Sequence, residues 1–167
     1  MSIDYIGLSE IMTKNVKVEE QNQNILGISK IMSDNDIGSV IIVDDLNTRN
    51  PIGIITERDI IRILGTLKPQ TLQTPIKDLM SKPIIPLSLQ ATIADAIKLM
   101  HERKIRRIPI VDKNSSLVGI VTENDIFKVL VNNKNLLNSV IENTSYGADK
   151  SIYKELLNYL VDTSFIK

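Results

Sequence analysis

The sequence has no cysteine, no tryptophan and a single histidine, His101. Without cysteine there is no disulfide, no thiolate nucleophile and no cysteine-ligated metal site, and one histidine cannot supply a histidine-rich site. No stretch approaches the roughly 18 uncharged apolar residues that span a bilayer, and the N-terminus lacks a basic region followed by an apolar run. We therefore expect no metal ion, no membrane partner and a cytoplasmic location.

Neither sign of charge is in excess, because 20 basic and 20 acidic residues leave a formal net charge of zero. A general nucleic-acid-binding protein carries a broad positive field, and the basic group at residues 103–107 has no interleaved aromatic residues. We expect no nucleic-acid partner. The sequence also has no phosphate-binding loop of the G-x-x-x-x-G-K-S/T type and no set of nucleophile and base, so we do not expect an enzyme.

The sequence is instead dominated by an internal repeat. IMTKNVKV at residues 11–18 corresponds to LMSKPIIP at residues 79–86, and DIGSVIIVD at residues 36–44 to KIRRIPIVD at residues 104–112. GIITERDI at residues 53–60 returns as GIVTENDI at residues 119–126. The shared order of these motifs, with one change of loop length, indicates a duplication.

Each repeat is predicted to form a short strand, an amphipathic helix, two strands and a closing helix. Thr92 can cap the helix of the second repeat, in which Asp95 lies in the favourable first turn. Apolar residues recur at helical spacing in both repeats, namely Ile25, Ile28, Ile31 and Met32 in the first and Ile93, Ala96, Ile97 and Met100 in the second. Two β-branched runs follow each helix and predict a hairpin, with turns at Asn50-Pro51 and Asn114-Ser115. The closing helix of the first repeat is expected to be held by its apolar residues Ile60, Ile61 and Leu64.

We place the first repeat at residues 8–65, a linker at residues 66–74 and the second repeat at residues 75–131. The remaining residues, 132–167, show apolar side chains at helical spacing and predict C-terminal helices. One interpretation is that these helices pack on the repeats or on a second copy of the chain. The other is that they convey a binding signal elsewhere.

The Thr-x-x-Asp element in each copy of the repeated stretch has two interpretations. Thr56 and Asp59, like Thr122 and Asp125, resemble a capping box, in which a hydroxyl and a carboxylate satisfy free backbone groups where a helix begins. The same geometry suits a nucleotide, because a helix start attracts phosphate and a neighbouring carboxylate can accept both hydroxyls of a ribose. The element alone favours the cap.

The complete pattern resembles the cystathionine beta-synthase (CBS) domain family, arranged as a tandem pair called a Bateman module. The resemblance covers about residues 8–131 and rests on both Gly-x-x-Thr-x-x-Asp signatures, the IRRIPIVD strand and the IMT and LMS starts. It implies an α/β fold of the α+β type, with two β-α-β-β-α repeats packed through their sheets about a pseudo-twofold axis. It also implies two clefts that bind AMP, ADP, ATP or S-adenosylmethionine.

In that family each cleft combines the Thr-x-x-Asp element of one repeat with the first strand and hairpin entry of the other. Cleft A would therefore contain Thr56, Arg58, Asp59, Lys82, Pro83, Ile84, Ile105, Arg106 and Arg107. Cleft B would contain Lys14, Asn15, Val16, Ile37, Gly38, Ser39, Thr122, Asn124 and Asp125.

The two predicted clefts differ in charge. Cleft A has three arginines that suit a phosphate chain, although Arg106 and Arg107 point to opposite faces of a strand. In cleft B, Asn124 takes the place of Arg58, and Lys14 is the one obvious cation. We expect cleft A to bind phosphorylated adenosine more strongly, with Asp59 and Asp125 holding ribose hydroxyls.

The resemblance implies a non-catalytic sensor that signals through a conformational or dimer change. We expect a homodimer formed through exposed Ile and Met residues of the repeat helices, and an effector protein as a further partner. The alternative is a structural or interaction module without a ligand, in which both Thr-x-x-Asp pairs serve only as caps. A raised melting temperature in the presence of an adenosine compound would distinguish the two.

Overall fold

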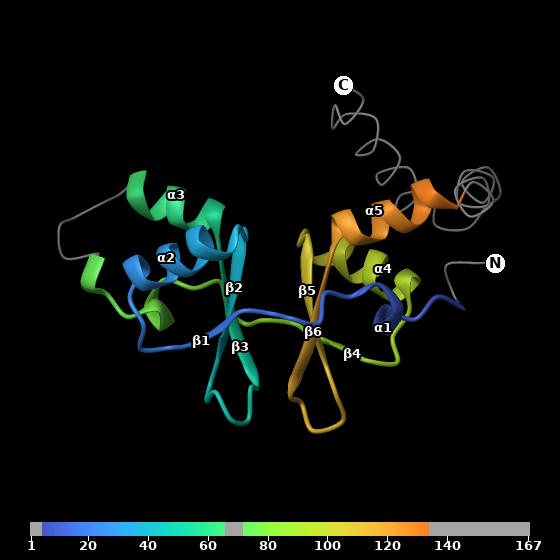
Figure 1. The fold of residues 1–167 in the computed structure, drawn as a ribbon, viewed down its shortest axis with the longest axis horizontal. Coiled ribbons are helices and arrows are strands. Elements are labelled where there is room, and N and C mark those ends of the chain that lie inside the picture. The colour runs from blue at the N-terminus through green and yellow to red at the C-terminus, as the bar shows by residue number, and fades with distance from the viewer. Residues whose placement is uncertain (1–4, 66–71, 134–167) are drawn as a thin grey trace. The chain divides into compact units, whose positions relative to one another are not determined.

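The computed structural model describes residues 5–65 and 72–133. Two three-stranded sheets form from the two repeats (Figure 1). The first has the order β1 (Val18–Glu20), β2 (Ser39–Val43) and β3 (Pro51–Thr56), and the second has β4 (Leu87–Ser88), β5 (Arg107–Val111) and β6 (Leu117–Thr122). The first strand of each sheet runs parallel to the second, and β2 and β3 are antiparallel.

The helices complete the predicted order of elements in both repeats. The first repeat contains α2 (Ile25–Asn35) and α3 (Glu57–Gly65), and the second contains α4 (Ile93–Arg103) and α5 (Glu123–Asn132). A short helix α1 (Leu8–Ile11) opens the first repeat, and a 3-10 helix η3 (Ile76–Asp78) lies near the start of the second repeat, before β4. The mixed α/β class and the two-repeat order are thus confirmed.

The chain folds into two compact units, and each unit takes the opening segment of the other repeat. Of the described chain, one unit holds residues 13–65, 72–88 and 109–119, and the other holds residues 5–12, 89–108 and 120–133. In the first unit, Ile76 N donates to Gln23 O at 2.7 Å, and in the second, Leu8 N donates to Ala91 O at 2.8 Å. The opening segment of each repeat therefore lies against the residues that lead into the first long helix of the other repeat, α2 or α4.

Apolar side chains at the predicted helical positions build the core of each unit. Ile28 and Met32 of α2 pack with Val40, Ile42 and Ile55 of the sheet and with Ile76 from the second repeat. On α4 the four predicted residues Ile93, Ala96, Ile97 and Met100 are all buried. Burying an aliphatic side chain of this size contributes about 1.5–3 kcal/mol, so the amphipathic pattern accounts for how these helices are held.

Three details differ from the sequence-based expectation. Pro51 is the first residue of β3 and pairs with Val43, so the predicted Asn50-Pro51 turn lies earlier, between Asp44 and Asn50. Ile61 and Leu64 of α3 are 70% and 48% exposed, although apolar periodicity suggested that they hold the helix on the core. The expected exposure of Ile and Met on the repeat helices is also wrong for several positions, which are buried: Ile25, Ile28, Met32, Ile93, Ile97 and Met100.

The predicted C-terminal helices lie outside the described residues, and so does most of the predicted linker. None of the helices in the described ranges is long and apolar enough to cross a membrane.

Candidate functional site

The repeated stretch of the first repeat forms a capping box where β3 passes into α3. The backbone N–H of Thr56 donates to Asp59 Oδ2 at 3.0 Å, and the Thr56 hydroxyl donates to the same oxygen at 2.7 Å. In return, Asp59 N donates to Thr56 Oγ1 at 3.3 Å. The predicted capping role is confirmed, because both side chains satisfy backbone groups that the helix leaves unpaired.

Asp59 is also the one charged residue that is buried in the described part of the chain, with 6% of its surface exposed. Its second oxygen, Oδ1, forms an ion pair with Arg62 one helical turn later and accepts a bond from Ser81 Oγ at 3.4 Å. A buried carboxylate is costly unless it is paired and hydrogen-bonded, and Asp59 is both.

Ser81 reaches Asp59 because the start of the second repeat lies along β3. Ser81 N donates to Ile54 O at 2.9 Å and Ile54 N donates to Ser81 O at 3.1 Å, which forms an antiparallel bridge. The next residue, Lys82, donates from Nζ to Lys77 O at 2.8 Å. Part of the predicted cleft A is thereby brought together, since Thr56 and Asp59 lie beside the segment that leads into Lys82, Pro83 and Ile84.

Position 38 in the first repeat and position 106 in the second lie at the start of the closing helix of their own repeat. Glu57 N donates to Gly38 O at 3.2 Å, and Glu123 N donates to Arg106 O at 3.0 Å. Ser39 is paired with Thr56 across the sheet. Gly38 and Arg106 therefore occupy equivalent places, which supports the sequence alignment of the two repeats.

The second repeat forms the same capping box. Thr122 donates to Asp125 Oδ2 from its backbone N–H at 2.9 Å and from its hydroxyl at 2.6 Å, and Asp125 N donates to Thr122 Oγ1 at 3.3 Å. Among the described residues, Asp125 accepts bonds from Thr122 alone. Its Oδ1 therefore has no partner there, in contrast to Oδ1 of Asp59.

The remaining predicted residues are exposed or half-buried. In the set for cleft A, Arg58 and Arg106 are exposed and Arg107 is half-buried, and in the set for cleft B, Lys14, Asn15 and Asn124 are exposed. Val16 accepts a bond at 3.5 Å from Arg49 Nη2 through its carbonyl. Each predicted set draws residues from both units, so the clefts as wholes stay predictions.

Sequence reasoning missed Arg62 and Ser81. Arg62 follows Asp59 by three positions on a helix, a spacing that commonly joins opposite charges and was available in the sequence. No comparable sequence signal pointed to Ser81. Its contact with Asp59 arises because residues 79–81, at the start of the second repeat, lie along β3 of the first repeat. Where the chain is described, no group of three or more His, Cys, Asp or Glu residues is placed to hold a metal ion.

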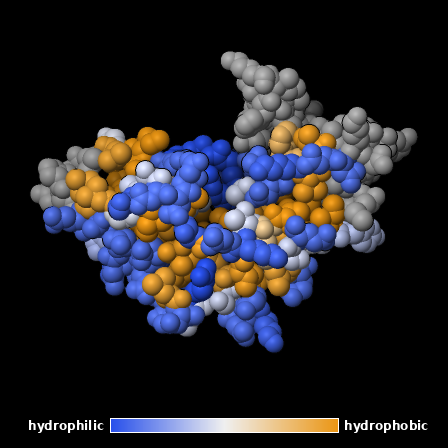
Figure 2. All heavy atoms as spheres, in the orientation of Figure 1, coloured by the Kyte–Doolittle hydropathy of each residue, from blue (hydrophilic) through white to orange (hydrophobic). Residues whose placement is uncertain are grey.

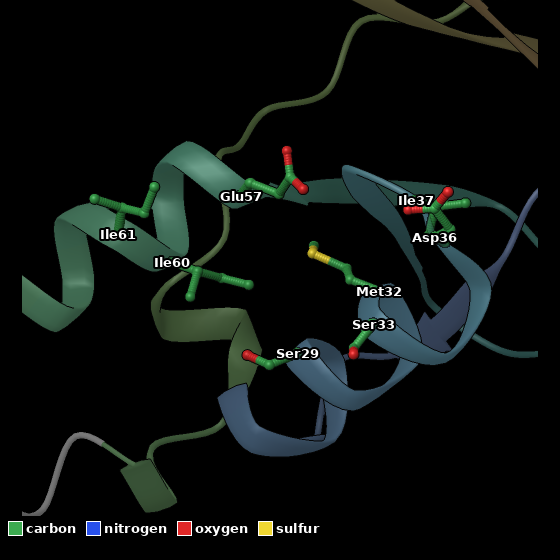
Figure 3. Close-up of a pocket in the computed structure, with 8 residues that line it drawn as sticks. All are labelled: Ser29, Met32, Ser33, Asp36, Ile37, Glu57, Ile60 and Ile61. Carbon is green, nitrogen blue, oxygen red and sulfur yellow. The ribbon is translucent and has the colours of Figure 1, made fainter.

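A separate hollow of about 650 Å³ lies between α2 and α3 (Figure 3). Met32 of α2 and Ile60 of α3 point toward one another across it. Its wall is mixed apolar and polar, and it consists of Ser29, Met32, Ser33, Asp36, Ile37, Glu57, Ile60 and Ile61. Ile37, predicted for cleft B, thus lines this helix-side hollow.

Comparison with known proteins identifies the family. The model of the CBS domain matches residues 8–66 and 76–132, so the chain belongs to the CBS domain family and contains a tandem pair of these domains. Protein MJ0653 of Methanocaldococcus jannaschii is 41% identical over 157 residues, which are 94% of this chain and 76% of that protein. Protein MJ1404 of the same organism is 33% identical over an alignment that covers 96% of this chain.

The chain spans 40% of the length of MJ1404 and 62% of the length of MK0525 from Methanopyrus kandleri, to which it is 36% identical over 74% of this chain. Among solved structures, the CBS domain pair of protein MJ0100 in complex with 5′-methylthioadenosine and S-adenosyl-L-methionine is 27% identical. The structural match covers 74% of this chain and 98% of the MJ0100 domain pair, with a TM-score of 0.65.

Proposed function

We propose that this CBS pair is a non-catalytic regulatory module that binds an adenosine-containing ligand in the two predicted clefts. Asp59 and Asp125 hold ribose hydroxyls, and the starts of α3 and α5 face the anionic group of the ligand, which is a phosphate or the carboxylate of S-adenosylmethionine. The observation that carries the proposal is the buried carboxylate of Asp59, which lies at a helix start beside a segment of the other repeat. The adenosine ligands of the MJ0100 pair support the ligand class.

A helix start and a carboxylate are complementary to the two ends of such a ligand. The free N–H groups and the positive dipole end of α3 or α5 favour an anionic group. A carboxylate accepts the two hydroxyls of a ribose. AMP, ADP, ATP and S-adenosylmethionine all combine a ribose with an anionic phosphate or carboxylate group, and they are the candidate ligands in a cytoplasmic setting.

The chain itself provides a control for the carboxylates. Thr92 and Asp95 form a third capping box, in which Thr92 N and Thr92 Oγ1 both donate to Asp95 Oδ2 at 2.9 Å. This box begins α4 and is not part of either predicted cleft. Asp95→Asn therefore reproduces the capping defect of Asp59→Asn and Asp125→Asn without touching the proposed sites.

The test is calorimetric titration of the native chain and these three variants with adenosine, AMP, ATP and S-adenosylmethionine. We expect binding to the native chain and to Asp95→Asn, and loss of one binding event in each of Asp59→Asn and Asp125→Asn. Absence of binding of all four compounds at millimolar concentration would contradict the proposal. Equal effects of Asp95→Asn and the other two variants would also contradict it.

Signal output in this proposal passes through a homodimer or an effector protein. A ligand changes such an equilibrium only if it binds one arrangement more tightly than the other. The helices α2 and α3 expose the apolar side chains Leu26, Ile61 and Leu64, and Figure 2 shows apolar atoms gathered where α3 lies in Figure 1. We propose this helix face as the contact with a second copy.

The second candidate is a ligand-free structural module. The specific observation in its favour is that the Thr92 box has the same hydrogen bonds as the two repeated boxes. In that case Thr56 and Thr122 only begin their helices, and the same titrations show no binding.

A further inference from the structure

The hydrogen-bonding capacity of the two repeated carboxylates is used to different extents. An ionised carboxylate has about four acceptor positions on its two oxygens. Asp59 already accepts from four donors, namely Thr56 N, Thr56 Oγ1, Arg62 Nη2 and Ser81 Oγ. Asp125 accepts from two, Thr122 N and Thr122 Oγ1, and both bond the same oxygen.

A ribose offers two hydroxyl donors, so it needs two acceptor positions on its carboxylate. At Asp125 the two positions on Oδ1 are open among the described residues. At Asp59 the ribose must displace two donors, and those on Oδ2 are the capping bonds that begin α3. The donors that give way are therefore Arg62 and Ser81 on Oδ1.

Arg62 is the stronger of these two competitors, because a charge-assisted bond to a carboxylate is roughly twice as strong as a neutral one. The Ser81 bond is also long, at 3.4 Å. The Arg62 side chain is 70% exposed, so it can move into water, whereas that of Asp59 is 8% exposed. Displacement of Arg62 leaves the buried carboxylate without its cation, which opposes binding of an uncharged ligand.

The described part of the second repeat has no ion pair that corresponds to the one between Arg62 and Asp59. Lys128 stands at the position of Arg62, 66 residues later like Asp125 after Asp59, and is exposed. No ion pair between Lys128 and Asp125 occurs in the described ranges. The two repeats therefore differ in whether the aspartate of the repeated stretch forms an ion pair within its own helix. This difference adds to the exchange of Arg58 for Asn124.

We propose that Arg62 is a specificity-determining residue that occupies the ribose-binding oxygen of Asp59 in the ligand-free protein. It makes the Asp59 site selective for ligands whose anionic group offers the released guanidinium a new partner. Uncharged adenosine then binds the Asp125 site in preference. This inference rests on the proposed function, and it adds which ligand charge each site accepts and which residue sets the choice.

The test measures each site separately by titration with adenosine and with AMP. The Asp125→Asn background reports the Asp59 site, and the Asp59→Asn background reports the Asp125 site. Within these backgrounds, Arg62→Gln is compared with Lys128→Gln as the matched control. We expect Arg62→Gln to raise adenosine affinity at the Asp59 site by roughly two- to fivefold, the upper range of an ion pair with an exposed partner. AMP affinity should rise less or fall.

Lys128→Gln should leave adenosine affinity at the Asp125 site within about twofold. The inference is overturned if Arg62→Gln leaves adenosine affinity at the Asp59 site unchanged or lowers it, while the sites still bind. If no variant and no background binds adenosine or AMP, the proposed function fails as well, and the two failures are thus distinguishable.

A second measurement requires no ligand. Urea unfolding of Arg62→Gln, Asp59→Asn and the double variant gives the coupling between the two side chains, and Lys128→Gln with Asp125→Asn gives the matched value. We expect coupling for the first pair and none for the second. Absence of coupling between Arg62 and Asp59 overturns the inference even if a variant binds poorly.

Discussion

Met80 packs directly against the backbone of Gly53, so that a Cβ atom added at Gly53 would overlap Met80 Sδ and lie 2.9 Å from Met80 Cγ. Gly53 is the first residue of the repeated stretch GIITERDI, and Met80 belongs to the LMS start of the other repeat. The glycine of the signature therefore has a packing role. It allows the crossing segment to approach β3 closely enough for Ser81 to reach Ile54 and Asp59.

Gly53→Ala should destabilise the fold by about 1–3 kcal/mol, the usual cost of inserting a methyl group into close packing. Urea unfolding would measure it. Gly65→Ala is the control, because among the described residues no atom lies within 4 Å of a Cβ at Gly65, apart from its chain neighbours and the backbone of its own helix. Combination of Gly53→Ala with Met80→Ala should recover part of the loss. An unchanged unfolding midpoint for Gly53→Ala would show that Met80 moves aside freely.

The order of elements in the repeats could be predicted from sequence because it depends on local signals. The positions of Ile93, Ala96, Ile97 and Met100 on one face of a helix follow from helical periodicity, and all four are buried. The capping boxes of Thr56 and Thr122 follow from a spacing of three residues. Two copies of each motif made the family resemblance specific, and the family match confirms it.

Contacts between distant segments could not be predicted in the same way. The exposure of Ile61 was not apparent, because an apolar residue on a helix has the same sequence signal whether it faces a core or an interface. One of the hydrogen bonds to the carboxylate of Asp59 comes from Ser81, which is 22 residues away in the chain, on the segment that crosses from the second repeat. The cleft residues Ile105, Arg106 and Arg107 remain predictions from the family pattern.

Removal of a capping hydroxyl should cost similar stability at each of the three boxes. Thr56→Ala, Thr92→Ala and Thr122→Ala each delete one acceptor for the N–H of the aspartate three residues later. The expected loss is about 1 kcal/mol per variant, measured by urea unfolding. Thr→Ser at the same positions keeps the hydroxyl and serves as the control. Serine variants as unstable as the alanine variants would indicate that the methyl group, and not the hydrogen bond, matters.

The turn between β2 and β3 should make stability depend on pH in the acid range. For Asp44, desolvation works to raise the pKa, but hydrogen bonds from Thr48, Asn50 and Asp45 outweigh it and lower the pKa below its ordinary value of 3.8. For Asp45, hydrogen bonds from the backbone N–H groups of Asn47 and Thr48 lower the pKa. The folded state therefore favours both ionised forms.

Because both pKa values are lowered on folding, their stabilising contribution is fully present above about pH 4 and is lost as pH falls through the folded-state values. Asp44→Asn should be less stable than the native chain at pH 7, and the difference should shrink as pH falls below 3.8. Urea unfolding of both proteins between pH 7 and pH 2.5 measures this difference. A difference that stays constant over the whole range would contradict the assignment.

The exposed apolar side chains of α3 should determine whether the chain forms a dimer. Ile61 is 70% exposed and lines the hollow between α2 and α3, and Leu64 is 48% exposed on the same helix. If this face contacts a second copy, Ile61→Asp places a charge in an apolar interface without a partner. We expect at least a tenfold weaker dimer, measured by sedimentation at several protein concentrations, because even about 1.4 kcal/mol gives that factor.

Leu46→Asp is the matched control for Leu64→Asp, because both leucines are 48% exposed and Leu46 lies in the turn between β2 and β3. The control should leave the dimer unchanged, while Leu64→Asp should weaken it as Ile61→Asp does. A native chain that is monomeric at all concentrations would contradict the proposed dimer. Equal weakening by Leu46→Asp would place the contact elsewhere than on α3.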